Sequence, residues 1–172
     1  MAILSDRTII SHIENGRLEF EPEVSASQIQ PGSLDIRLGD SYSNEFTGEV
    51  YEDQDQLVFE PGTFYLGHTK ETVTLPDDIC AIISGRSSIA RKGLIIHTTA
   101  GWIDAGFSGE ITLEIMNFNN EPIILPKDKR VGQLVFFQMD TPAEKPYGSQ
   151  ESSKYQGQKG PTRSRLKDTV QE

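Results

Sequence analysis

Apolar and polar residues alternate along most of this chain in short segments, a pattern typical of half-buried β-strands. The segments with this period of two are 33–39, 63–69, 80–85, 94–98, 110–118, 123–126 and 133–139. Between them stand PGS, EPG, LPDD, NNEP and LPKDKR, which hold the residues that favour tight turns. Many short strands separated by turns predict an all-β sandwich or jelly roll.

The N-terminal segment follows a different pattern. Ser5 is a suitable N-cap for a helix over DRTIISHIENG, and Gly16 is a suitable residue just past its end. Ile9, Ile10 and Ile13 would form one apolar stripe. We therefore predict a short helix here and assign it no catalytic role.

The composition changes near residue 145. Residues 145–172 are rich in Gly, Ser and Gln and almost free of aliphatic residues, so they cannot form a core alone. We predict one β domain over residues 1–144 with a flexible C-terminal lid over 145–172. This segment is either a disordered tail or one that orders over a ligand.

The charge of the chain excludes some classes of partner. A formal net charge of −10 argues against broad binding to nucleic acid or to anionic membranes. Residues 40–60 hold seven acids and no Lys or Arg, whereas basic residues gather in 85–109 and 145–172. A small polyanion would therefore find positive charge in the last two segments.

Several features favour a cytoplasmic protein. No apolar run is as long as a membrane span, and the N-terminus lacks the basic start and long apolar core of a signal peptide. The single cysteine, Cys80, excludes an internal disulfide framework and suits a reducing compartment.

The sequence GRSSIAR, residues 85–91, places anion-binding groups directly after a predicted strand. Arg86, Ser87, Ser88 and Arg91 offer guanidinium groups and hydroxyls suited to a triphosphate. A short helix beginning in SSIARKG would add anion affinity. The alternative is a solvated turn with two arginines, which the absence of nearby acids makes less attractive.

A glycine-rich hairpin, TTAGWIDAGFSGE, surrounds Asp104. Glycine permits tight turns and a close approach of the backbone to a ligand. One interpretation is an ordinary hairpin with Trp102 and Phe107 in the core. The other is a deoxyribose pocket in which Asp104 accepts a hydrogen bond from the 3′-hydroxyl.

Glu114 lies within the apolar strand ITLEIM. Ile111, Leu113 and Ile115 would point to one face, and Glu114 to the other. An ordinary solvent-facing carboxylate is the alternative to a carboxylate that shuttles protons beside a substrate. One Cys and three widely spaced His residues cannot build the zinc site of the zinc deaminases, so a deamination here would need a carboxylate and hydrogen bonds to activate water.

Five elements, taken in order, resemble the trimeric dUTPase superfamily and most closely its dCTP deaminase branch. They are QPGSLDIRLG, GRSSIAR, AGWIDAGFSGEI with TLEI, RVGQLVF and KYQGQKG. The resemblance spans the chain from Leu4 to about residue 165. It implies a distorted jelly-roll β-barrel of the dUTPase-like type, assembled as a homotrimer with shared active sites. Within the first element, Asp35 and Arg37 would be mainly structural.

The resemblance also implies catalytic roles. Glu114 would deprotonate the attacking water and protonate the leaving ammonia. Ser87 would position that water together with the backbone carbonyl of Ala100, and Arg91 would orient substrate and water. Asp104 would activate a second water that attacks the α-phosphate. The implied nucleotide-binding set is Arg86, Ser87, Ser88, Ile89, Ala90, Arg91, Ala100, Asp104, Thr112, Leu113, Glu114, Gln133, Tyr147, Lys154 and Gln158.

Gly101 and Trp102 resemble the deaminases that continue to dUMP. The expected activity is therefore hydrolytic deamination of dCTP coupled to triphosphate hydrolysis, giving dUMP, ammonia and pyrophosphate. The alternatives are a deaminase that releases dUTP, a dUTPase only, and a nucleotide-binding protein without turnover.

The resemblance further implies that Mg²⁺ arrives with the triphosphate rather than on protein ligands, that zinc is not used, and that dTTP is a candidate feedback inhibitor. His12, His68 and His97 are interpreted as packed or surface residues.

Overall fold

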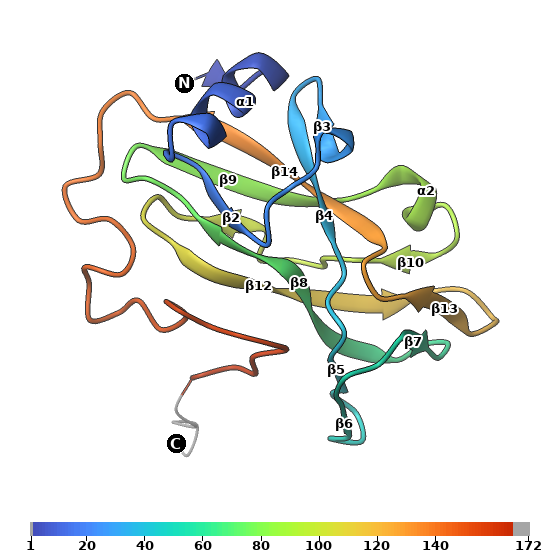
Figure 1. Ribbon diagram of the computed structural model, residues 1–172. Helices are drawn as coiled ribbons and strands as arrows, with labels where there is room; N and C mark the ends of the chain where they lie inside the picture. The colour runs from blue at the N-terminus through green and yellow to red at the C-terminus, as the bar shows by residue number, and fades with distance from the viewer. Residues whose placement is uncertain (1, 167–172) are drawn as a thin grey trace.

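The computed structural model describes residues 2–166, which form a mainly antiparallel β structure (Figure 1). The helical elements are α1 (Asp6–Glu14), the 3₁₀ helix η1 (Ala26–Gln28) and α2 (Ser87–Ala90). The strands are β1 (Ala2–Ile3), β2 (Glu19–Glu21), β3 (Ile29–Gln30), β4 (Ser33–Arg37), β5 (Tyr42–Asn44), β6 (Val50–Tyr51), β7 (Gln56–Phe59), β8 (Phe64–Thr74), β9 (Ile79–Gly85), β10 (Leu94–Ile95), β11 (Trp102–Ile103), β12 (Ser108–Asn117), β13 (Ile123–Pro126) and β14 (Arg130–Gln138).

Two six-stranded sheets enclose the core. The first has the order β11-β9-β14-β4-β3 with β1 on β14, and the second has the order β10-β12-β8-β5-β6 with β2 on β8. β7 and β13 form a separate pair. Side chains of both sheets, such as Phe136 of β14 and Leu113 of β12, belong to one buried cluster. The all-β class is thus confirmed.

A closed barrel is not shown for residues 2–166. The two sheets keep separate hydrogen-bonded ladders, and an isolated bridge between Leu38 and Thr69 links them. Residues 2–166 therefore form two sheets that pack against each other through one buried cluster.

Every segment predicted as a strand contains one, but some boundaries differ. β8 continues to Thr74, beyond the predicted end at residue 69. The predicted segment 94–98 is a strand only at Leu94–Ile95. It ends early because Thr98 and Thr99 hydrogen-bond to Glu114 instead of continuing the ladder.

Helix α1 lies where it was predicted. It follows Ser5, and Gly16 beyond its end has a φ of 65°, which suits glycine. Ile9 is fully buried and Ile13 packs beside it, whereas Ile10 is 40% exposed, so the predicted stripe is wrong at Ile10. Ile9 and Ile13 are four residues apart and share one face of the helix, whereas Ile10 lies about 100° around the helix axis from Ile9. None of the helices in residues 2–166 combines the length and apolar character that a membrane crossing requires.

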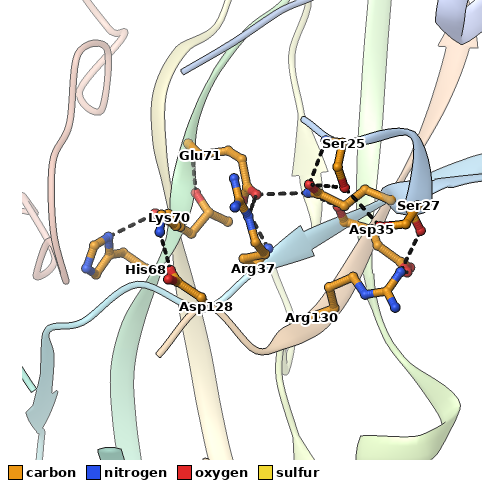
Figure 2. Close-up of polar contacts among 11 residues, drawn as sticks. Ser25, Ser27, Asp35, Arg37, His68, Lys70, Glu71, Asp128 and Arg130 are labelled. Atoms are coloured by element: carbon orange, nitrogen blue, oxygen red, sulfur yellow. Dashed lines mark hydrogen bonds and ion pairs between the residues drawn. The ribbon is translucent and has the colours of Figure 1, made fainter. Parts of the chain in front are cut away.

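A buried carboxylate ties the two sheets together. Glu71 of β8 is 0% exposed; its Oε1 accepts hydrogen bonds from Arg37 Nε at 2.6 Å and Gln28 Nε2 at 3.0 Å. Its Oε2 accepts one from Arg37 N–H at 2.9 Å. Figure 2 shows Glu71 and Arg37 within a wider row of polar contacts. Buried charges need partners of this kind, and the contacts agree with the structural role predicted for Arg37.

Replacing Glu71 by Gln is expected to lower the free energy of unfolding by about 1–3 kcal/mol. The amide removes the negative charge that balances the Arg37 guanidinium. Its NH₂ group would also face the N–H donors of Arg37 and Gln28, which now bond to carboxylate oxygens. Urea unfolding at neutral pH measures the change, with Glu121→Gln, an exposed acid, as the matched control. Equal midpoints for the two variants would contradict the role of Glu71.

Candidate active site

A cleft of about 600 Å³ lies beside the second sheet and brings together many of the residues predicted from the sequence. We call it the Glu114 cleft. Strand β12, the hairpin that contains β11 and the C-terminal segment all contribute to its wall. The predicted residues that line it are Ala100, Trp102, Asp104, Thr112, Glu114, Tyr147 and Gln158.

The alternation predicted for β12 holds residue by residue. Ile111, Leu113 and Ile115 are buried in the core, whereas Thr112 and Glu114 are half-buried on the opposite face. Glu114 therefore faces the cleft from the middle of a rigid strand. Leu113 can meet a ligand only through its backbone, because its side chain is 0% exposed.

Thr99 holds the carboxylate of Glu114 in place. Its backbone N–H and its hydroxyl each donate to Glu114 Oε2 at 3.0 Å. Within residues 2–166, Glu114 Oε1 takes part in no hydrogen bond, so this oxygen can meet a ligand or a water. The arrangement presents one fixed acceptor oxygen to the cleft.

Thr99 and His97 lie beside Glu114, and sequence reasoning missed both of them. Two adjacent threonines after a predicted strand were a signal for Thr99, but their partner is distant in sequence. His97, predicted as a packed or surface residue, is half-buried and lines the cleft. Its Nδ1 lies 3.5 Å from Glu114 N, a long contact that supports the strand beside the carboxylate.

The hairpin presents Asp104 to solvent with one side chain bonded to it. Trp102 Nε1 donates to Asp104 Oδ1 at 3.0 Å, and the Trp102 ring stacks on Phe137 at 6.0 Å. Trp102 is 51% exposed and Phe107 is 7% exposed, so only Phe107 fits the interpretation in which both are core residues. Trp102 and Asp104 also line a neighbouring cleft of about 570 Å³.

Gly101 has a packing reason to be glycine. A Cβ built there would lie 3.0 Å from the carbonyl oxygen of Ile83 and 3.5 Å from His97. The hairpin therefore approaches β9 more closely than a side chain would comfortably permit. This close approach places Trp102 and Asp104 beside the cleft.

Residues 156–162 of the C-terminal segment run beside β12, where Gly157 N–H donates to Ser108 O at 2.7 Å; residues 167–172 of the predicted lid lie outside the described part. Tyr147 N–H donates to Ala105 O at 2.8 Å, and its ring packs 5.9 Å from Phe107. Gln158 is buried and lines the cleft, whereas Lys154 is exposed.

The predicted phosphate-binding residues line a different hollow of about 460 Å³. We call it the Arg86 hollow; it is formed in part by Arg86, Ser87, Ser88 and Gln133. α2 begins at its edge, with Ile89 buried beneath and Ala90 and Arg91 exposed. Within one chain, Ser87 and Arg91 are thus not among the residues around Glu114.

Asp35 positions Arg86 in this hollow. The Asp35 side chain is 1% exposed, and its two oxygens lie 3.3 Å from Arg86 Nε and 3.3 Å from Arg130 Nη1. Burial raises the pKa of Asp35, and the positive charges of Arg86 and Arg130 act in the opposite direction. The guanidinium of Arg86 is therefore held by a buried acid and remains able to meet an anion.

The side chains in residues 2–166 form no group of three or more His, Cys, Asp or Glu suited to hold a metal ion. Asp104 and Glu114 still offer carboxylate oxygens to the same cleft. A hard cation could bind there only with further oxygen ligands, such as those of a phosphate or water.

Residues 3–139 match the family model for dCTP deaminase-like proteins. A protein of Beutenbergia cavernae named dCTP deaminase, dUMP-forming, is 46% identical, and the match covers 95% of this chain and 94% of that protein. A protein of Halobacterium salinarum with the same name is 40% identical over 96% of this chain and 95% of its own length.

Solved structures show the same fold. The 2′-deoxycytidine 5′-triphosphate deaminase from Agrobacterium tumefaciens superposes with a TM-score of 0.68 at 25% identity. The match covers 78% of this chain and 47% of that one. The EIAV dUTPase superposes with a TM-score of 0.54 at 19% identity, over 76% of this chain and 95% of its own, and supports the fold alone.

Proposed function

Because this chain belongs to the dCTP deaminase-like family, we propose that it is an enzyme that deaminates dCTP and hydrolyses the triphosphate, giving dUMP, ammonia and pyrophosphate. The observation that carries the proposal is the presence of Glu114 and Asp104 in one cleft. Each carboxylate suits one of the two hydrolyses. The relatives named dUMP-forming are 40–46% identical over at least 95% of this chain, which supports the coupled reaction over release of dUTP.

Glu114 would act as the proton shuttle of the deamination. Thr99 fixes Oε2, so Oε1 can accept a proton from the water that attacks C4 of the cytosine ring. The same carboxyl group would return that proton to the departing amine, which leaves as ammonia. Because the carboxylate stands on a strand, it needs little reorganisation between the two transfers.

Asp104 would serve the sugar and the phosphate. Its carboxylate would accept a hydrogen bond from the 3′-hydroxyl and activate the water that attacks the α-phosphate. The Trp102 indole holds Asp104 by one oxygen and leaves the other for the substrate. Pyrophosphate is then the leaving group and dUMP the product.

We propose that the site is completed by a neighbouring subunit in a homotrimer. The support is that the Glu114 cleft and the Arg86 hollow have no lining residue in common. A neighbour's Arg86 hollow placed against the Glu114 cleft would add the phosphate-binding groups, with Ser87 and Arg91, to the carboxylates.

A mixed trimer tests this sharing. Arg86→Gln and Glu114→Gln are each expected to be inactive alone, because each removes one half of the site. Coexpressed with two affinity tags and purified through both, they should give mixed trimers with about a third of the wild-type ammonia release, since one of the three sites in each mixed trimer combines two intact halves. Activity no greater than that of the single variants would contradict a shared site.

Mg²⁺ would enter with the triphosphate and supply neutralisation of phosphate charge. A dUTPase from a Staphylococcus aureus phage is described with a structural Mg(II) ion. The ion would be held by phosphate oxygens and by water rather than by protein ligands. We further propose a cytoplasmic enzyme on which dTTP acts as a feedback inhibitor, because it shares the deoxyribose and triphosphate of the substrate.

Replacing Thr99 by Val is expected to lower the rate of ammonia release about tenfold, because one charge-assisted hydrogen bond to Glu114 is lost. The backbone N–H bond remains, so the carboxylate loosens without leaving the cleft. Steady-state ammonia release measures the rate. Thr98→Val is the matched control, since the Thr98 hydroxyl bonds only to the Glu114 carbonyl. A Thr99 variant no slower than this control would contradict the role.

A further inference from the structure

Glu110 binds the C-terminal segment where this segment crosses β12. Its Oε2 accepts a hydrogen bond from Gly160 N–H at 2.6 Å, and its own N–H donates to Gln158 O at 3.0 Å. Two residues further along β12, Thr112 Oγ1 accepts a hydrogen bond from Thr162 N–H at 3.3 Å. The segment is thus held along the strand by bonds that include one carboxylate.

His68 fixes this carboxylate from the protein side. His68 Nδ1 lies 2.9 Å from Glu110 Oε2 and 2.9 Å from Thr69 O. Both neighbours are acceptors, so Nδ1 carries the proton and donates it. His68 is 8% exposed, and a Cβ on Gly39 would lie 2.2 Å from its ring. The acceptor that meets Gly160 is therefore held in place before the segment docks.

A second acid holds the segment from the other side of the cleft. Arg163 Nε lies 3.1 Å from Glu45 Oε1, and Arg163 Nη2 donates to Gly48 O at 3.2 Å. Ser43 Oγ donates to Glu45 Oε1 at 2.6 Å and fixes that carboxylate. Glu45 belongs to the acidic segment 40–60, for which sequence reasoning found no role.

We propose that the Glu110–Gly160 and Glu45–Arg163 contacts form a latch that keeps the C-terminal segment over the Glu114 cleft until the dUTP made by deamination has been hydrolysed. The proposal rests on the proposed function. Tyr147 and Gln158 of the same segment line the cleft, so opening of the segment would uncover the bound nucleotide. The latch residues are positioning residues that set the ratio of dUMP to dUTP.

The physical reason is a competition between two rates. Bound dUTP either loses pyrophosphate to water or leaves when the segment opens. Faster opening of the segment raises the share of dUTP that leaves before it is hydrolysed. Deamination takes place before this competition, and its rate depends on Glu114. A weakened latch should therefore change the products more than the rate of ammonia release.

Glu45→Gln and Arg163→Gln test the latch in the full-length enzyme. With saturating dCTP and Mg²⁺, each variant should raise the share of product released as dUTP several-fold, with ammonia release within about twofold of wild type. In the free protein, trypsin should cleave Glu45→Gln after Lys159 about tenfold faster, because cleavage requires local opening. The charge-swapped pair Glu45→Arg with Arg163→Glu should restore both readouts toward wild type.

Glu52→Gln is the matched control, an exposed acid of the acidic segment 40–60 whose side chain forms no hydrogen bond or ion pair with residues 145–166. The latch is refuted if Glu45→Gln and Arg163→Gln match this control in cleavage and products. A wild type that releases mainly dUTP, or that makes no ammonia, would defeat the proposed function instead, and the trypsin rates would still decide whether the contacts hold the segment.

Discussion

Replacing Glu114 by Gln should lower ammonia release from dCTP by about 10⁴-fold, the upper range for loss of a general acid–base group. The amide oxygen can still accept both hydrogen bonds from Thr99, so the side chain should keep its place. It cannot accept the proton of the attacking water or return it to the amine. Nucleotide binding should change little, because the phosphate and sugar contacts lie elsewhere.

Two measurements separate these effects. Ammonia release gives the deamination rate, and calorimetric titration with dCTP gives the affinity. The variant should also keep hydrolysing added dUTP to dUMP, which shows that the fold and Asp104 are intact. Near-normal ammonia release by Glu114→Gln would show that another group moves the proton.

Replacing Asp104 by Asn should separate the two hydrolyses. We expect pyrophosphate release to fall about 10³-fold, because the amide cannot take a proton from the second water. The amide oxygen can still accept the Trp102 indole hydrogen bond and so preserve the hairpin. Ammonia release should continue, and dUTP should accumulate as the main product.

The matched control is Asp140→Asn, an exposed acid in the neighbouring cleft. It should make dUMP as the wild type does. If Asp104→Asn released pyrophosphate as fast as this control, Asp104 would have no role in hydrolysis of the triphosphate. Loss of ammonia release as well would indicate that Asp104 mainly binds the sugar.

Local patterns predicted much of the fold. The alternation over 110–118 correctly separates buried Ile111, Leu113 and Ile115 from Glu114, because neighbouring side chains of a strand point to opposite faces. Gly16 likewise marked the end of α1. Two of the strands that the pattern missed, β6 and β11, have two residues each, too few to show a period.

The parts of the candidate site that could not be predicted depend on contacts between distant segments. Thr99 meets Glu114 across 15 positions, and Arg163 meets Glu45 across 118. Neither pair has a local signature, because its geometry depends on how the sheets pack. The division of the predicted residues between the Glu114 cleft and the Arg86 hollow is likewise a result of tertiary structure.

The coupled reaction is tested most directly by product analysis. Purified enzyme is incubated with dCTP and Mg²⁺, and the nucleotides are separated by ion exchange at successive times. The proposed function predicts that dUMP and pyrophosphate appear together with ammonia, without accumulation of dUTP. Accumulating dUTP would contradict the coupled reaction and leave a deaminase that releases its first product.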